Sequence, residues 1–280
     1  MASNKGEVQE PINESLDYGN WKFLSRKSHI LNSKCTSNSQ CESVPVTTSE
    51  TDKRRLYCDH CCFAKLLELP ELPEMCFPQS FLIIEHCSGV RICFAAFDAL
   101  QLVDAHNDKL KVQMAEKWKE ERSNTQGVGD VVHPFDWTYT TEYTGTIVPN
   151  PPHSIKIELT EEQINLEKLK QQEKILFYND IILFEDELAD NGVSILRVKI
   201  RVMTSCFFIL LRQFLRVDGV LIRVNEARYY HEKDSKYILR EISCREGATK
   251  DIHPTLHTQQ DEVARILPVK LLKMEKLMLP

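Results

Sequence analysis

Apolar and polar residues alternate with the period of a β-strand along much of the C-terminal half of the chain. Between residues 193 and 203 the two classes separate by parity: Leu196, Val198, Ile200 and Val202 take one set of positions, and Arg197, Lys199 and Arg201 take the other. Successive side chains of a strand point to opposite faces of its sheet. The pattern therefore predicts a strand with one buried apolar face and one charged face.

Turn-forming residues divide this half of the chain into successive strands. Asp190-Asn191-Gly192, Asp218-Gly219 and Glu232 to Ser235 separate the apolar runs at 181–188, 193–203, 207–217, 220–230 and 237–242. Because Asn-Gly and Asp-Gly tolerate the positive φ angles of tight hairpin turns, an antiparallel meander is predicted. A two-residue loop at Asn191-Gly192 would place Asp186 opposite Arg197, whereas a longer loop would shift that pairing.

The N-terminal half mixes strand and helix signals. Two apolar runs around Ser88-Gly89 predict a hairpin at 81–94, and residue types at 135–148 and 155–159 favour further strands. Helical spacing predicts short helices at 63–69, 95–103 and 110–121, and the capping box that begins at Thr160 predicts a helix over 161–174. The expected fold class is α+β, with antiparallel β-sheets built from hairpins and accompanying helices.

Composition predicts how the chain divides. Residues 1–20 have few large apolar groups and are expected to form a disordered tail. Residues 21–280 are expected to form a single domain. Within that domain, the Cys- and Ser-rich stretch at about 33–62 is interpreted as a flexible insertion.

Charge and hydropathy narrow the classes of function. The 280 residues carry a net charge of −6, with 42% hydrophobic and 27% charged residues, which is an ordinary globular balance. The negative net charge argues against a broadly basic surface that binds nucleic acid. No apolar run is long enough to cross a bilayer, and residues 1–20 lack the apolar centre of a signal peptide. We therefore expect a cytoplasmic protein that contacts neither nucleic acid nor membrane and keeps its thiols reduced.

The search for catalytic motifs favours a protein that is not an enzyme. The chain has no phosphate-binding P-loop, metalloprotease motif, nucleophile elbow or kinase motif set. Glu185, Asp186 and Glu187 are adjacent acids, but neighbours on a strand point to opposite faces and do not converge on one substrate. No catalytic residue is assigned.

The cysteines leave one alternative open. Cys58 and Cys61 have one half of a zinc-site spacing, and Cys35 and Cys41 could supply the other half. The favoured interpretation is a set of unpaired thiols with no metal and no cofactor. The alternative is a zinc-binding protein, or a metalloenzyme, that uses the 35–62 cysteine cluster.

Several longer motifs carry a family resemblance. They are Asp136-Trp137-Thr138-Tyr139-Thr140-Thr141, Leu183 to Leu188, Val198 to Met203, and Leu211 to Leu221. In this order they resemble the TIPRL family, the TOR signalling pathway regulator-like proteins, over roughly residues 21–280. The stretch at 33–62 is longer than its counterpart in that family, so the resemblance implies nothing about its role.

The resemblance implies a regulator that has no activity of its own. Such a protein would bind the catalytic subunits of phosphatases 2A, 4 and 6 and modulate their activity or assembly in TOR signalling. It also implies four partner-binding positions: Asp98, Ile164, Val224 and Glu226. Val224 and Glu226 depart from the more usual Met and Asp. The alternatives are core packing for Ile164 and Val224 and a helix cap for Asp98.

Overall fold

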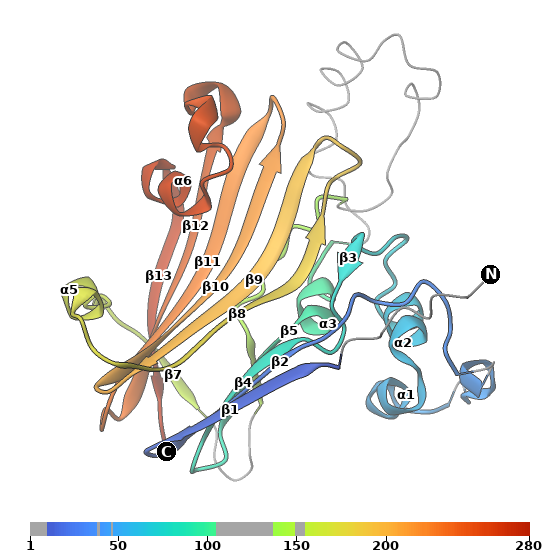
Figure 1. Cartoon of the computed structure of the whole chain (residues 1–280), viewed down its shortest axis with the longest axis horizontal. Coiled ribbons are helices and arrows are strands. Elements are labelled where there is room, and N and C mark those ends of the chain that lie inside the picture. The colour runs from blue at the N-terminus through green and yellow to red at the C-terminus, as the bar shows by residue number, and fades with distance from the viewer. Residues whose placement is uncertain (1–9, 38–39, 46, 105–136, 149–154) are drawn as a thin grey trace, which may run out of the picture.

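Two antiparallel sheets form the body of the molecule (Figure 1). The computed structural model describes residues 10–37, 40–45, 47–104, 137–148 and 155–280. The small sheet has the strand order β1-β2-β4-β5-β6, and the large sheet has the order β3-β8-β9-β10-β11-β12-β13-β7. Strands dominate the described residues, so the expected α+β class holds only in the sense of a mostly β fold with few helices.

The large sheet confirms the predicted meander. Its central strands are long and follow one another in sequence: β8 (Ile175–Asp186), β9 (Gly192–Met203), β10 (Cys206–Val217), β11 (Leu221–Glu232), β12 (Tyr237–Ala248) and β13 (Val269–Met278). Two short strands, β3 (Met75–Cys76) and β7 (Lys156–Leu159), complete its edges. The alternation read from the sequence thus fixes which face of each strand is buried.

The loop between β8 and β9 is longer than two residues. Asp186 pairs with Ser194, and Arg197 lies opposite Ile182. Three consecutive residues of this loop, Leu188, Ala189 and Asp190, adopt positive φ angles. The longer-loop alternative is therefore the one that the structure adopts.

The small sheet contains β1 (Ile12–Tyr18), β2 (Trp21–Lys27), β4 (Phe81–His86), β5 (Arg91–Ala95) and β6 (Thr146–Val148). The 81–94 hairpin is confirmed, but the expectation of a disordered tail through residue 20 is wrong for residues 12–18. The backbone of β2 supplies ladder partners for β1, and Leu16 and Tyr18 pack partly against the core. Amino-acid composition alone does not predict the pairing of β1 with β2. Residues 1–9 lie outside the described residues.

The main apolar core lies between the two sheets. The inward residues of β2, such as Phe23, meet those of β10 and β11, such as Phe207 and Tyr229, and all three side chains are fully buried. The indole of Trp21 packs edge-on against Phe207, with ring centroids 5.2 Å apart. One face of the large sheet is therefore covered by the small sheet.

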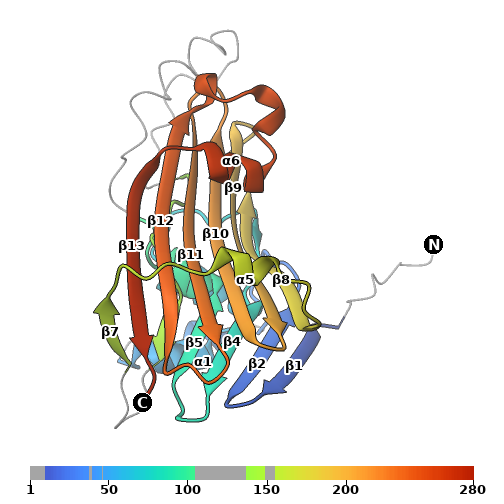
Figure 2. The same ribbon diagram turned by 90° about the vertical axis from the view of Figure 1, so that its left-hand side faces the viewer.

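Two helices lie over the opposite, outer face of the large sheet, as Figure 2 shows. α5 (Leu166–Lys170) crosses one end of the sheet and α6 (Gln260–Ile266) covers the other, with the short 3-10 helices η2 (Thr249–Asp251) and η3 (Pro254–Leu256) leading into α6. The helices α1 (Glu50–Leu56), α2 (Asp59–Leu66) and α3 (Ala96–Leu100), with the 3-10 helix η1 (Gln40–Ser43), lie on the side of the small sheet (Figure 1).

The helix and loop predictions need several corrections. The helix expected over 161–174 spans only Leu166–Lys170 and is capped by Asn165. The hydroxyl of Thr160 accepts a hydrogen bond from the Glu162 N–H, but the Glu162 side chain is held by other partners and the backbone stays extended. In the described part of 135–148 only β6 is a strand. The helix expected at 110–121 lies outside the described residues.

The stretch at 33–62 also differs from the expected flexible loop. It contains η1, α1 and the start of α2, and the α1 N-cap Ser49 accepts a hydrogen bond from the Asp52 N–H. The sequence indicated only a polar composition, which is common to loops and to small units held by something other than an apolar core.

Candidate partner-binding face

The outer face of the large sheet carries a band of alternating charges between α5 and α6. At its β8 edge, Asp180 accepts hydrogen bonds from the guanidinium of Arg197 at 3.1 and 3.2 Å, and the Lys199 ammonium lies 3.6 Å from the same carboxylate. The predicted basic face of β9 is therefore confirmed as the outward face.

The centre of this band is a buried ionic network. Arg212 on β10 and Glu226 on β11 are 2.6 Å apart, with side chains only 6% and 0% exposed. The second oxygen of Glu226 lies 2.5 Å from Arg228, which also reaches Glu241 on β12 at 3.0 Å. On the other side, Arg212 lies 2.5 Å from Asp261 at the start of α6. The network ties three strands and one helix together.

Arg212 and Asp261 stabilise each other's charged form. Burial by itself would lower the pKa of Arg212, but the negative charges of Glu226 and Asp261 keep that pKa above its usual value. The hydrogen bond from Arg212 lowers the pKa of Asp261 in turn. Since a buried charge without its partner is costly, each member depends on the others.

Val224 lies two residues before Glu226 on the same face and is completely buried. It packs in a second apolar cluster with Phe214 and Ile222 of the sheet and Val263 and Leu267 of the α6 region. The side chain thus fastens α6 to the sheet and is not available on the surface.

Ile164 is buried in a third cluster at the opposite end of this face. It lies with Leu169 of α5 against Met203, Tyr230 and Leu239 of the sheet. The segment around it is held by polar contacts as well. Glu162 accepts a hydrogen bond from the Tyr237 hydroxyl at 2.7 Å and pairs with Lys276 at 2.6 Å.

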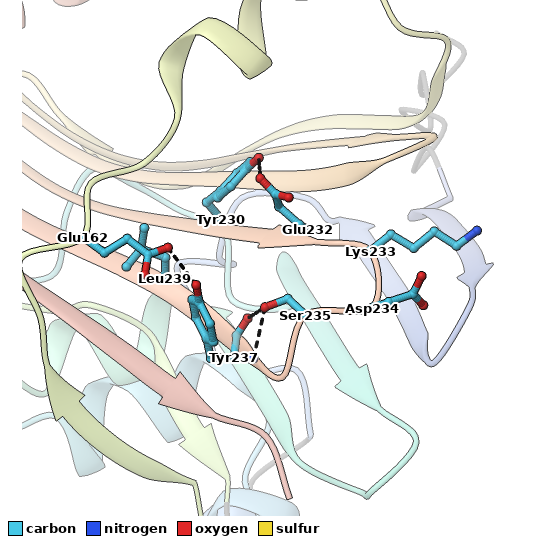
Figure 3. A pocket seen from close by; sticks show the side chains of 8 residues that line it. All are labelled: Glu162, Tyr230, Glu232, Lys233, Asp234, Ser235, Tyr237 and Leu239. Atoms are coloured by element: carbon cyan, nitrogen blue, oxygen red, sulfur yellow. Dashed lines mark hydrogen bonds between the residues drawn. The ribbon is translucent and has the colours of Figure 1, made fainter.

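A pocket of about 250 Å³ opens beside this cluster, at the turn between β11 and β12 (Figure 3). Its lining residues are Glu162, Tyr230, Glu232, Lys233, Asp234, Ser235, Tyr237 and Leu239. Hydrogen bonds from Lys276 and Lys168 lower the pKa values of Glu162 and Glu232, so both carboxylates are ionised. The volume falls below the roughly 300–1,000 Å³ typical of small-molecule sites.

Apolar side chains remain exposed around the charged band. They are Tyr178 on β8 (56% exposed), Leu166 on α5 (53%), Ile266 on α6 (54%) and Leu272 on β13 (50%). Aromatic and aliphatic anchors beside charged groups are the usual ingredients of a protein–protein interface. This face, from α5 to α6, is the outer face referred to below.

Asp98 lies on the other side of the molecule, in α3. Its carboxylate accepts a hydrogen bond from the Thr146 hydroxyl at 2.7 Å and pairs with Arg54 of α1 at 3.3 Å. The N-cap position of α3 is Ala95, so Asp98 is not the cap of that helix. The structure therefore brings Val224 and Glu226 together, places Ile164 on the same face, and separates Asp98 from all three.

The four cysteines of the zinc alternative come together in the structure. The sulfur atoms of Cys35, Cys41, Cys58 and Cys61 all lie within 4.8 Å of one another. Although burial tends to raise it, the pKa of Cys58 falls to about 5 because its sulfur accepts hydrogen bonds from the backbone of Cys61 and Thr36 and from neighbouring thiols. Burial and the neighbouring thiols raise the pKa of Cys61 to about 12. The sequence identified both pairs of cysteines as candidate ligands, but it did not show that the two pairs lie close together in the fold.

The middle one of the adjacent acids at 185–187 has a structural role. Asp186 is buried, and its two oxygens accept the backbone N–H groups of Glu74 and Leu188 at 2.9 and 2.7 Å. Its role is to close the β8–β9 loop against β3. Among the described residues, none of the helices has the length and apolar character needed to cross a membrane.

Comparison with known proteins places the chain among a set of related sequences. The family model described as the TIP41-like family matches residues 75–253. The TIP41-like protein of Rattus norvegicus is 42% identical over 95% of this chain and 90% of its own length, and that of Homo sapiens is 42% identical over 94% and 89%. The Type 2A phosphatase activator TIP41 of Saccharomyces cerevisiae is 36% identical over 86% of this chain and 65% of its own length. The four clustered cysteines precede the residues that the family model matches.

Proposed function

The chain belongs to the TIP41-like family, and we propose that it is a non-catalytic regulator that binds the catalytic subunits of type 2A-like serine/threonine phosphatases. Its partners would be the catalytic subunits of phosphatases 2A, 4 and 6, whose activity or assembly it modulates in TOR signalling. It would act in the cytoplasm. The observation that carries the proposal is the similarity, over most of the chain, to a yeast relative named as a type 2A phosphatase activator.

The outer face supports a binding role. It combines four exposed apolar side chains with charged groups that remain partly exposed, such as Asp180, Lys199 and Asp261, so a partner could bury apolar area and pair polar groups at once. A stable contact of this kind buries on the order of 1,600 Å² in total. The long strands and the ionic network keep the face rigid, which limits the entropy lost on binding.

The four partner-binding positions implied by the family resemblance would act in two ways. Ile164, Val224 and Glu226 are buried, so we assign them positioning roles: they hold α5 and α6 on the sheet. The carboxylate of Asp98 is 21% exposed and could touch a partner directly, but only from the opposite side of the large sheet. A partner that uses both sides would have to reach around the edge of the body.

A pull-down from cell extract at near-physiological salt tests the function. We expect the full chain to recover phosphatase catalytic subunits, identified by mass spectrometry. Failure to recover any of them would contradict the proposed function.

A pair of matched variants tests the face. Leu272→Asp places a charge on the outer face and should reduce recovery about tenfold or more, as loss of a central apolar anchor does. The control is Ile12→Asp, because Ile12 is 59% exposed on the small sheet, away from the outer face. Equal recovery by the two variants would rule out the outer face while leaving the phosphatase partner in place.

A further inference from the structure

Residues 35–66, here called the cysteine module, have almost no apolar interior of their own. Their largest buried groups, Cys62 and Phe63, belong to the main core and fasten the module to the body. Among the other described residues of the module, the buried side chains are those of Cys41 and Cys61, which belong to none of the apolar clusters. The described centre of the module is therefore built from sulfur atoms.

The helices of the module are too short to be stable alone. α1 has seven residues and α2 has eight, whereas isolated helices shorter than about 12–15 residues are marginal in water. Leu56, the last residue of α1, is 55% exposed. Apolar contacts with the body hold α2, so a further interaction is needed to keep η1 and α1 in one arrangement with it.

The four thiols lie close enough together to surround one metal ion. In a zinc–thiolate tetrahedron the Zn–S bonds of about 2.3 Å place neighbouring sulfurs about 3.8 Å apart. The sulfurs of Cys35 and Cys58 lie 3.8 Å apart, and all four lie within 4.8 Å of one another. A disulfide needs about 2.05 Å, and the cysteines are all free.

The surroundings of the cluster also match a closed site. The backbone N–H of Cys58 points at the sulfur of Cys41, 3.3 Å away, as N–H groups do around metal-bound thiolates. His60 is turned elsewhere, since its Nδ1 lies 3.0 Å from the carbonyl oxygen of Asn32. The four ligands therefore come from two segments, 35–41 and 58–61, which a bound ion would cross-link.

We propose that the sulfurs of Cys35, Cys41, Cys58 and Cys61 bind one structural zinc ion that holds the cysteine module together. Four thiolates from the protein complete the coordination of zinc and leave no open position for substrate, so the site is structural and not catalytic. The dication also offsets the repulsion between thiolates packed at this distance. The proposal departs from the favoured interpretation, a set of unpaired thiols with no metal. Of the two forms of the alternative, it takes the zinc-binding protein and not the metalloenzyme.

The zinc site has a consequence for Asp98. The guanidinium of Arg54, in α1, lies 3.7 Å from the centre of the Phe97 ring and pairs with Asp98. Phe63, in α2, packs edge-on against the same Phe97 ring. By fixing α1 and α2, zinc would hold Arg54 over α3 and so control how Asp98 is presented.

Metal analysis of the purified full-length protein tests the proposal. We expect about one zinc per chain by mass spectrometry, and Cys58→Ser and Cys35→Ser should each lose most of it. The control is Cys87→Ser, because Cys87 is an exposed thiol outside the module. Zinc content below about a tenth per chain, iron in place of zinc, or disulfides among the four cysteines would overturn the proposal.

A second measurement avoids the risk that the serine variants fail to fold. The wild-type protein is treated with a zinc chelator and digested briefly with trypsin, with circular dichroism as a check on the sheets. We expect cleavage at Lys53, Arg54 or Arg55 in α1 to become at least tenfold faster while the β signal stays unchanged. An unchanged rate of cleavage in α1 after zinc removal would overturn the structural role. Neither readout involves a phosphatase, so the result is independent of the proposed function.

Discussion

The two-sheet body and the cysteine module are held in their folded arrangements by different kinds of interaction. The body buries large side chains from both sheets, such as Phe23, Phe94 and Phe207, and its stability comes from apolar area removed from water. The module places four sulfurs at its centre and needs a cross-link instead. One chain can therefore contain a region specified by the periodicity of its apolar residues and another region specified by the spacing of its cysteine ligands.

The largest effect should follow from opening the core of the body. Phe207 is fully buried between Trp21 and Phe23. Phe207→Ala should lower the free energy of unfolding by about 3–5 kcal/mol, because it removes a large apolar contact and leaves a cavity. Urea denaturation followed by tryptophan fluorescence measures the change. The zinc content of the folded variant should stay at the wild-type value. Loss of zinc together with the loss of stability would show that the body and the module do not fold independently.

The next effect concerns the ionic network of the outer face. Glu226→Ala leaves Arg212 and Arg228 without their shared carboxylate and should cost about 3 kcal/mol, since the buried charge of Arg212 then keeps only the exposed Asp261 as a partner. Asp261→Ala removes the other, 65% exposed, partner of Arg212 and should cost about 1 kcal/mol or less. Thermal unfolding of both variants gives the comparison. Equal losses would mean that burial does not govern this network.

A smaller effect is expected where the module meets the body. Arg54→Ala removes the contact with the Phe97 ring and the pairing with Asp98, and it should cost about 1 kcal/mol or less because Arg54 is 37% exposed. Trypsin digestion of the module, at sites other than residue 54, should become faster with no change in zinc content. Loss of zinc in this variant would contradict a module that is held by its own metal.

The smallest effect is a pH dependence of the body. Burial beside Trp21 and Phe207 lowers the pKa of His231 from 6.5. The unfolded chain then binds the proton more readily, so the stability from this group is present above pH 6.5 and is lost as the pH falls through the lower folded value. The melting temperature should drop between about pH 7 and pH 5, and His231→Phe should reduce the drop. His253→Gln, at an exposed loop position, is the control; an identical drop in all three proteins would refute the assignment to His231.

The two regions also differ in what the sequence revealed. Alternation in 193–203 predicted β9 and its outward basic face correctly, because burial of one face is a local property of a strand. The network around Glu226 was not predicted, since Asp261 is 49 residues from Arg212 in the chain. No local pattern in the sequence predicts which helix will lie over which strand.

The same limit explains the other corrections. The capping-box pattern at Thr160 was overridden because Glu162 pairs with Lys276 and Ile164 packs into the sheet. Strand β1 was missed because its partner, β2, supplies the interaction and its own residues are mostly exposed. The cysteine spacing at 58–61 indicated half of a metal site, but only the fold brings the pair at 35 and 41 to it.

Direct binding between purified components tests the central claim most directly. The full-length protein is titrated at near-physiological salt with the catalytic subunit of phosphatase 2A, with isothermal calorimetry as the readout. We predict a complex of one chain with one catalytic subunit, weakened by Leu272→Asp and unaffected by Ile12→Asp. The absence of measurable binding by the wild-type protein at micromolar concentrations would contradict the proposal that this chain regulates the enzyme by covering part of its surface.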